Sequence, residues 1–148
     1  MPVKLVLCVL LAHALVFAQD VKRIYIDGIG QKSSLDKAKL EKAKKDLVAQ
    51  LRKVKNVEVV DSPSQANVIL SGDGEIYIKG FYSLNPRSGI SPANGQPVYG
   101  GYLSVELKDT SGAILWSYLA NAPETKDAAH DLSKDIVRHL AAQLLGKS

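Results

Sequence analysis

Six stretches of the chain are rich in apolar residues, and several of them alternate between apolar and polar positions. They are residues 21–27, 57–60, 66–72, 75–82, 99–108 and 113–120. Alternation places every second side chain on the same face of a strand, so that one face is buried and the other meets solvent. Residues 109–112, with the sequence DTSG, predict a tight turn that pairs the last two strands as an antiparallel hairpin.

Apolar residues at three- and four-residue steps predict two amphipathic helices. The first begins near Ser33 or Ser34, which have capping character, and ends near Asn56. The second is capped by Thr125 and stopped by Gly146. The buried stripes consist of Leu40, Ala43, Leu47, Leu51 and Val54 in the first helix and of Ala129, Leu132, Ile136, Leu140 and Leu144 in the second.

These elements predict an α+β fold, a two-layer sandwich in which both helices cover one face of a mainly antiparallel sheet of about five strands. The sheet residues expected to face the helices share the buried phase of their strands: Ile24, Ile26, Ile76, Ile78, Leu103, Val105 and Leu107. Gly80 interrupts the alternation of its strand, which predicts a β-bulge at that position.

The N-terminus carries a separate signal. Lys4 is followed by an apolar run that closes at Ala18, the pattern of a secretory signal peptide cleaved near Ala18. The run is too short for a transmembrane segment, which needs about 20 residues. We therefore expect a periplasmic or secreted protein whose residues 19–148 form a single domain. The only cysteine, Cys8, lies within the signal, so the mature chain has no disulfide, thiol nucleophile or cysteine-ligated metal.

Aromatic residues suggest a binding surface on the side of the sheet away from the helices. Tyr25, Tyr77 and Tyr102 fall on that side if the alternation is right. The strand around Trp116 is compatible with both registers, and one of them adds Trp116 to the same face. An open sheet face with several aromatics is typical of a protein-binding surface. Tyrosine is also a good strand former that covers a pleated surface without binding anything.

Two further segments are candidates for contacts. Residues 84–97 form one long irregular loop, in which Arg87 lies between prolines and is a candidate for partner binding. Residues 33–55 contain eight basic and three acidic residues, and Lys42, Lys44 and Lys45 form the centre of this basic surface. Such a helix attracts anionic surfaces, or is simply a solvated face. Nucleic acid is not expected, because no RNA-binding motif is present and the protein is exported.

Catalytic chemistry has one candidate, in the last helix. Asp131, Asp135 and His139 follow one another at four-residue steps and would suit a metal-dependent hydrolase. The alternative is that Asp131 pairs with Lys134 and Asp135 with Arg138, as exposed neighbours on a helix do. No serine lies in a G-x-S-x-G elbow. We expect a protein without catalytic activity, metal or cofactor.

Three segments together resemble a known group of proteins. They are residues 57–61 (VEVVD), residues 66–72 (ANVILSG) and residues 103–116 (LSVELKDTSGAILW). The chain resembles bacterial envelope domains such as the TolB N-terminal domain, the curli-assembly CsgG family and the LpoB-type activators of penicillin-binding proteins. Asn67 stands where the group usually has Asp, and the chain lacks the lipobox cysteine of its lipoprotein members. The resemblance implies a non-catalytic periplasmic fold that contacts another envelope protein, with weak homo-oligomerisation as a further possibility.

Overall fold

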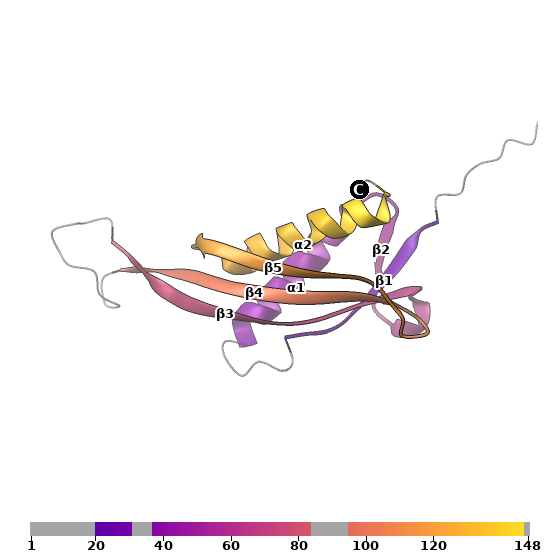
Figure 1. Cartoon of the computed structure of the whole chain (residues 1–148), viewed down its shortest axis with the longest axis horizontal. Coiled ribbons are helices and arrows are strands. Elements are labelled where there is room, and N and C mark those ends of the chain that lie inside the picture. The colour runs from indigo at the N-terminus through magenta and orange to yellow at the C-terminus, as the bar shows by residue number, and fades with distance from the viewer. Residues whose placement is uncertain (1–19, 31–36, 84–94, 147–148) are drawn as a thin grey trace, which may run out of the picture.

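A computed structural model of the chain describes residues 20–30, 37–83 and 95–146. Within these ranges the strands form one long sheet, and both helices lie beside it (Figure 1). They are β1 (Lys22–Ile29), α1 (Lys37–Leu51), β2 (Val57–Val60), the short 3₁₀ helix η1 (Pro63–Gln65), β3 (Val68–Tyr82), β4 (Gln96–Asp109), β5 (Ile114–Thr125) and α2 (Ala128–Leu144).

The sheet is mixed, with the strand order β2-β1-β3-β4-β5. β1 runs parallel to both β2 and β3, whereas β3 with β4 and β4 with β5 are antiparallel. The prediction of a mainly antiparallel sheet was therefore wrong. The reason lies in the strand–helix–strand order of β1, α1 and β2, since a helix supplies the long crossover that parallel neighbours need.

The strand predicted at 66–72 and the strand predicted at 75–82 are one continuous element, β3. Glycines permit the close approach of β3 and β4 along this stretch, because a Cβ atom on Gly74 would lie 2.4 Å from the backbone oxygen of Tyr102. The bulge predicted at Gly80 is confirmed by a shift of the β3–β4 register between Ile78 and Gly80.

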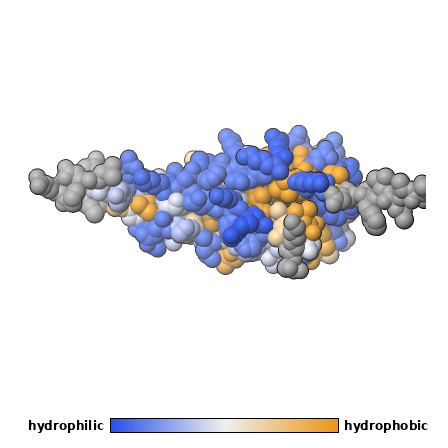
Figure 2. Space-filling view, turned by 90° about the horizontal axis from the view of Figure 1, so that it is seen from above, coloured by the Kyte–Doolittle hydropathy of each residue, from blue (hydrophilic) through white to orange (hydrophobic). Residues whose placement is uncertain are grey.

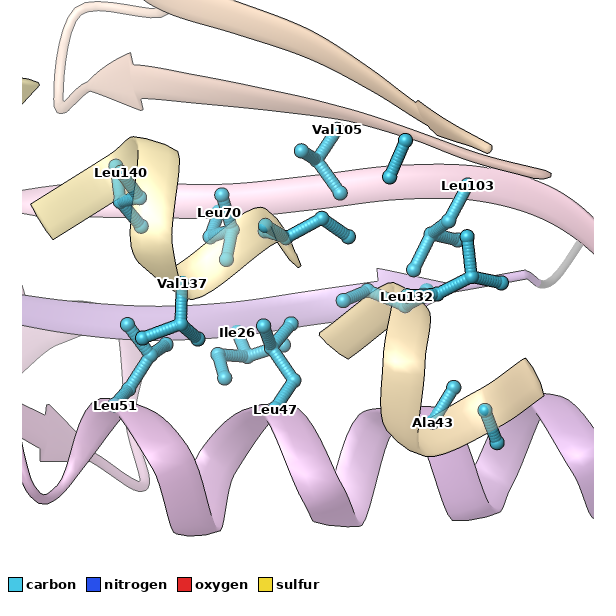
Figure 3. Packing of buried hydrophobic residues seen from close by; sticks show 14 of the residues in the cluster. Ile26, Ala43, Leu47, Leu51, Leu70, Leu103, Val105, Leu132, Val137 and Leu140 are labelled. Atoms are coloured by element: carbon cyan, nitrogen blue, oxygen red, sulfur yellow. The ribbon is translucent and has the colours of Figure 1, made fainter. Parts of the chain in front are cut away.

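A single hydrophobic core joins both helices to one face of the sheet (Figure 3). α1 contacts β1, β2 and β3, α2 contacts β4 and β5, and the two helices contact each other. Most residues of the predicted helix stripes are buried, and so are six of the seven sheet residues predicted to face the helices: Ile24, Ile26, Ile76, Leu103, Val105 and Leu107.

The seventh residue, Ile78, is 53% exposed, so its predicted burial was wrong. The β3–β4 hairpin continues past the ends of both helices (Figure 1). Ile78 keeps the phase of Ile76 in β3, but no helix covers it there (Figure 1). A strand pattern fixes which way a side chain points, and only the neighbouring layer decides whether it is buried.

The N-terminal cap of α2 differs from the prediction. Asp127, not Thr125, is the N-cap of α2, and its carboxylate accepts a hydrogen bond from the His130 N–H at 3.2 Å. The Thr125 hydroxyl instead donates to Asp131 at 2.7 Å. Gly146 has φ of 64°, in agreement with its predicted role as the helix stop. Ser33 and Ser34 lie outside the described residues.

The two helices pack closely where small residues face each other. Ser133 of α2 is fully buried, and its hydroxyl lies 2.8 Å from the carbonyl oxygen of Ala43 in α1 and 2.7 Å from that of Ala129. At one side of this contact the Lys42 ammonium donates to both carboxylate oxygens of Asp127, at 2.7 and 2.8 Å, and to Asp46 at 3.1 Å. These contacts fix α1 against α2.

Candidate functional site

Three large side chains are exposed next to one another on the sheet face opposite the helices. Tyr77 of β3, Tyr102 of β4 and Leu119 of β5 are 46%, 40% and 53% exposed, respectively. Two of them, Tyr77 and Tyr102, are residues that the alternation predicted on this face. We call the three residues the outer stripe.

The strand register places the members of the outer stripe side by side. Tyr77 is the direct partner of Gly100, and Leu119 is the direct partner of Ser104. Tyr102 lies two residues from each of these partners and is thus the diagonal neighbour of both Tyr77 and Leu119, a position from which aromatic side chains reach across a ladder. Because Gly100 has no side chain, the Tyr77 ring can lie against its backbone. A Cβ atom on Gly100 would be only 3.3 Å from the ring.

The outer stripe borders a polar depression. A hollow of about 340 Å³ lies on the same face and is lined by Gly28, Ser71, Gly72, Asp73, Ser104, Glu106 and Lys108. Lys108 pairs with Glu106 at 2.9 Å. The apolar stripe therefore has a polar and partly acidic border, the composition of an interaction patch with a rim.

Tyr25 is half-buried on the same face but stands apart from the outer stripe. It pairs with Val60 of β2 and Ile69 of β3, near the opposite end of the sheet. The structure thus does not gather all the predicted aromatics into one cluster. Arg87 lies outside the described residues.

Trp116 and Tyr118 point toward the helices, so the register that turns them outward is wrong. Both pack against the core, whereas Leu115 and Leu119 are exposed. The Tyr118 hydroxyl donates to Asp135 of α2 at 2.8 Å, and its ring stacks on His139 with centroids 4.1 Å apart. Partial burial, together with the hydrogen bond to Asp135, raises the pKa of Tyr118.

A signal for this register was present in the sequence. If Trp116 faces inward, the polar residues Ser117 and Asn121 fall on the solvent side and the small residue Ala120 falls in the core, as observed. The apolar run around Trp116 is ambiguous only when it is considered without the residues that follow it.

The proposed metal ligands of α2 are divided among different partners. Asp131 accepts the hydrogen bond from Thr125, while Asp135 accepts from Tyr118 and, at 2.6 Å, from Arg138. Asp135 and His139 do come close, with 3.5 Å between Oδ1 and Nδ1. Nowhere in the described part of the chain do three side chains of the metal-binding types gather into a possible ligand set. The arrangement ties α2 to β5 and does not favour the hydrolase hypothesis.

Of the three lysines predicted to form a basic surface, Lys42 is paired with carboxylates, whereas Lys44 and Lys45 remain on the flank of α1. Lys42 is engaged with Asp127 and Asp46, and the hydrogen bond to Asp127 raises the pKa of Lys42 and lowers that of Asp127. Lys44 and Lys45 line a shallow groove of about 340 Å³ on the flank of α1, together with Glu41, Val48, Ala49 and Arg52. A cationic flank therefore exists on α1, without Lys42.

No protein-family model matches the sequence, and no curated protein matches it. Several solved structures share its fold. A PelC dodecamer from Paraburkholderia phytofirmans is 19% identical, with a TM-score of 0.55, and the match covers 86% of this chain and 90% of that one. A hypothetical protein from Chlamydia trachomatis is 7% identical, with a TM-score of 0.58 and coverages of 84% and 99%. A minor lipoprotein from Acinetobacter baumannii is 12% identical, with a TM-score of 0.51 and coverages of 82% and 92%.

These likenesses establish a fold that bacterial proteins, a lipoprotein among them, also adopt. At such identities they transfer no activity. The resemblance to the TolB, CsgG and LpoB types stays a prediction. None of the helices in residues 20–30, 37–83 and 95–146 has the length and apolar character needed to cross a membrane.

Proposed function

We propose that this chain is an exported, non-catalytic accessory domain of the bacterial cell envelope that binds another envelope protein through the outer stripe. The observation that carries the proposal is the adjacency of exposed Tyr77, Tyr102 and Leu119 on the sheet face opposite the helices, beside a polar depression. Exposed aromatic and aliphatic residues at the centre of a polar rim are the usual composition of a contact surface.

Two observations support the location. The N-terminal pattern from Lys4 to Ala18 is that of a signal peptide, and processing near Ala18 would release residues 19–148. The fold is shared with bacterial proteins that include a lipoprotein of Acinetobacter baumannii. A domain exported in this way works where other envelope proteins are accessible to it.

The test is site-specific photo-crosslinking in cells of the source organism. A photoreactive phenylalanine replaces Tyr102, and in a second strain it replaces Lys134, an exposed residue of α2 on the other side of the molecule. We expect a crosslinked product of defined mass at position 102 and none at position 134. The same probe at Arg87 tests whether the loop takes part.

The crosslinked product must depend on the outer stripe. Tyr77→Ser and Leu119→Ser, introduced together, should abolish the product at position 102 while leaving the melting temperature of the domain unchanged. Equal crosslinking at positions 102 and 134, or a product that persists in the double variant, would contradict the proposal.

A second candidate function is self-association through the edge strand β5. β4 is its only strand neighbour among the described residues, and Ile114, Leu115 and Leu119 are exposed along it. Such an edge accepts another strand. The PelC structure with this fold is a dodecamer. A crosslinked product of twice the chain mass, together with a concentration-dependent mass in light scattering, would favour this candidate over a different partner.

A further inference from the structure

Exposed aliphatic side chains gather at one end of the molecule, away from the outer stripe. Val21, Ile114, Leu115 and Leu145 are 46%, 57%, 51% and 44% exposed. They come from three separate parts of the chain: the residue before β1, the start of β5 and the residue after α2. Figure 2 shows apolar residues collecting toward the end of the molecule at which α2 ends in Figure 1.

The sheet register brings these residues to the same end. Lys22 at the start of β1 pairs with Val57, and Ile114 at the start of β5 pairs with Lys108 near the end of β4. The last turn of α2 lies toward the same end (Figure 1). Two grooves follow the seam between α2 and the sheet. One, of about 190 Å³, is lined by Lys22, Val68, Leu107, Leu115, Trp116, Gln143 and Leu144, and the other, of about 210 Å³, by Asp20, Lys22, Lys55, Asn56, Val57, Leu144 and Leu145.

Cationic side chains surround the apolar residues at this end. Lys22 lies in both grooves, and Arg52, Lys53 and Lys55 are exposed in the turn that follows α1. The carboxylates at this end include Glu58, which is exposed on β2 and is the register partner of Arg23. Asp20 pairs with Lys22 at 3.0 Å. Asp109 is turned into the β4–β5 hairpin, where its carboxylate accepts from the N–H groups of Ser111 and Ala113 at 2.9 Å each. Positive charge therefore exceeds negative charge here.

We propose that this end of the molecule, from here on the basal end, rests on an anionic lipid bilayer. Aliphatic side chains that enter the acyl boundary, with lysine and arginine at the headgroup level, are what interfacial binding requires.

The basal end is distinct from the outer stripe, so the two proposals make separate predictions. A domain seated on a bilayer by its basal end leaves the outer face of the sheet free for a partner. It also differs from binding by the flank of α1, where Lys44 and Lys45 would carry the attraction instead of Lys53 and Lys55.

The test measures Trp116, the single tryptophan of the chain, which lines the first groove beside Leu115. The exported protein is mixed with vesicles of brominated phosphatidylglycerol and phosphatidylcholine, or of brominated phosphatidylcholine alone. We expect quenching of Trp116 emission on the anionic vesicles, relief of the quenching at high salt, and none on the zwitterionic vesicles. Quenching reports lipid contact at the basal end and not merely attachment of the chain.

Matched variants locate the contact. Leu115→Asp and Leu145→Asp should each weaken vesicle binding by about tenfold, because an aliphatic side chain is lost from the acyl boundary and a charge is added. Ile78→Asp is the control, since Ile78 is as exposed as Leu115 but lies toward the other end of the sheet. Lys53→Gln with Lys55→Gln should weaken binding by about fivefold per residue, whereas Lys44→Gln with Lys45→Gln should not.

Several outcomes would overturn the proposal. One is the absence of Trp116 quenching on anionic vesicles. Another is loss of binding on substitution of Lys44 and Lys45 with no effect at Lys53 and Lys55, which would assign the contact to the flank of α1. A third is a dimer in light scattering that Leu115→Asp dissociates, with no vesicle binding, which would make the basal end a contact between copies of this chain.

Discussion

Asn67 is bonded to Arg23 twice: its backbone N–H donates to the Arg23 carbonyl at 3.0 Å, and its side-chain Oδ1 accepts from the Arg23 N–H at 2.9 Å. Its side-chain amide also donates to the carbonyl of Val21 at 3.1 Å. The chain crosses from β2 to β3 immediately before this residue. Asn67 thus sets the position at which β3 begins beside β1, and it needs both a donor and an acceptor to do so.

Asn67→Asp should therefore destabilise the domain. The carboxylate keeps an acceptor for Arg23 but loses the donor to the Val21 carbonyl and brings negative charge beside it. We expect a loss of about 1 kcal/mol in the free energy of unfolding, measured with urea. Asn121→Asp, on exposed β5, should change it by less than about 0.5 kcal/mol. Equal losses in the two variants would argue against this role.

The Lys42–Asp127 pair should make stability depend on pH in a defined window. The pKa of Asp127 is lowered in the fold, so its contribution is present above the unfolded value of about 3.9 and is lost as pH falls through the folded value. The pKa of Lys42 is raised, so its contribution is lost only as pH rises through the folded value, above 10.5. The pair therefore contributes between these limits.

Lys42→Gln measures this contribution. Because the side chains of Lys42 and Asp127 are 44% and 51% exposed, water screens the pair, and we expect a loss of only about 0.5 kcal/mol at neutral pH. The loss should shrink toward zero in acid, where Asp127 is protonated. Lys44→Gln serves as the control in thermal unfolding at both pH values. A loss for Lys42→Gln that is the same in acid as at neutral pH would show that it does not come from the ion pair.

Ser133→Ala should weaken the contact between the helices. The Ser133 hydroxyl is fully buried, and it lies within hydrogen-bonding distance of the Ala43 carbonyl. Its removal should lower the free energy of unfolding by about 1 kcal/mol. Ser133→Leu should cost more, about 1–3 kcal/mol, because the added atoms force α1 and α2 apart. Ser117→Ala, at an exposed position of β5, should be neutral in the same denaturation series.

Gly101 and Gly80 should respond differently to alanine. A Cβ atom on Gly101 would lie 2.4 Å from the backbone oxygen of Glu75, whereas one on Gly80 would meet nothing within 4 Å. Gly101→Ala should therefore cost about 2–3 kcal/mol, since backbone must shift to admit it. Gly80→Ala should stay within about 0.5 kcal/mol of the parent. A tolerated Gly101→Ala would mean that β3 and β4 are less tightly apposed than described.

Local patterns in the sequence predict the elements well but not their arrangement. The alternation around Ile24 and Val105 assigns their faces, since the period of a strand is a local property. Strand direction is not local. The parallel pairing of β1 with β3 depends on the path of the chain from β2 to β3 near Asn67, which the hydrophobic pattern does not predict.

The candidate site divides along the same line. Tyr77 and Tyr102 could be placed on the outer face because polar residues alternate with core residues around them. Trp116 is ambiguous when its apolar run is considered alone; the residues that follow favour the inward register, and the contact of Tyr118 with Asp135 shows it in the structure. Leu119 was missed for the same reason. The basal end depends on residues that are far apart in the sequence and meet only in the fold.

The overhanging part of the β3–β4 hairpin, marked by exposed Ile78, has a consequence for how such a domain can diversify. Beyond Ile78, β3 and β4 pair only with each other among the described strands, and no residue of this part is buried. This arm contributes little to the hydrophobic core. Changes in its length or in its side chains should therefore alter the free energy of folding only slightly. The same central body can therefore extend to targets at different distances while its own stability is left almost untouched.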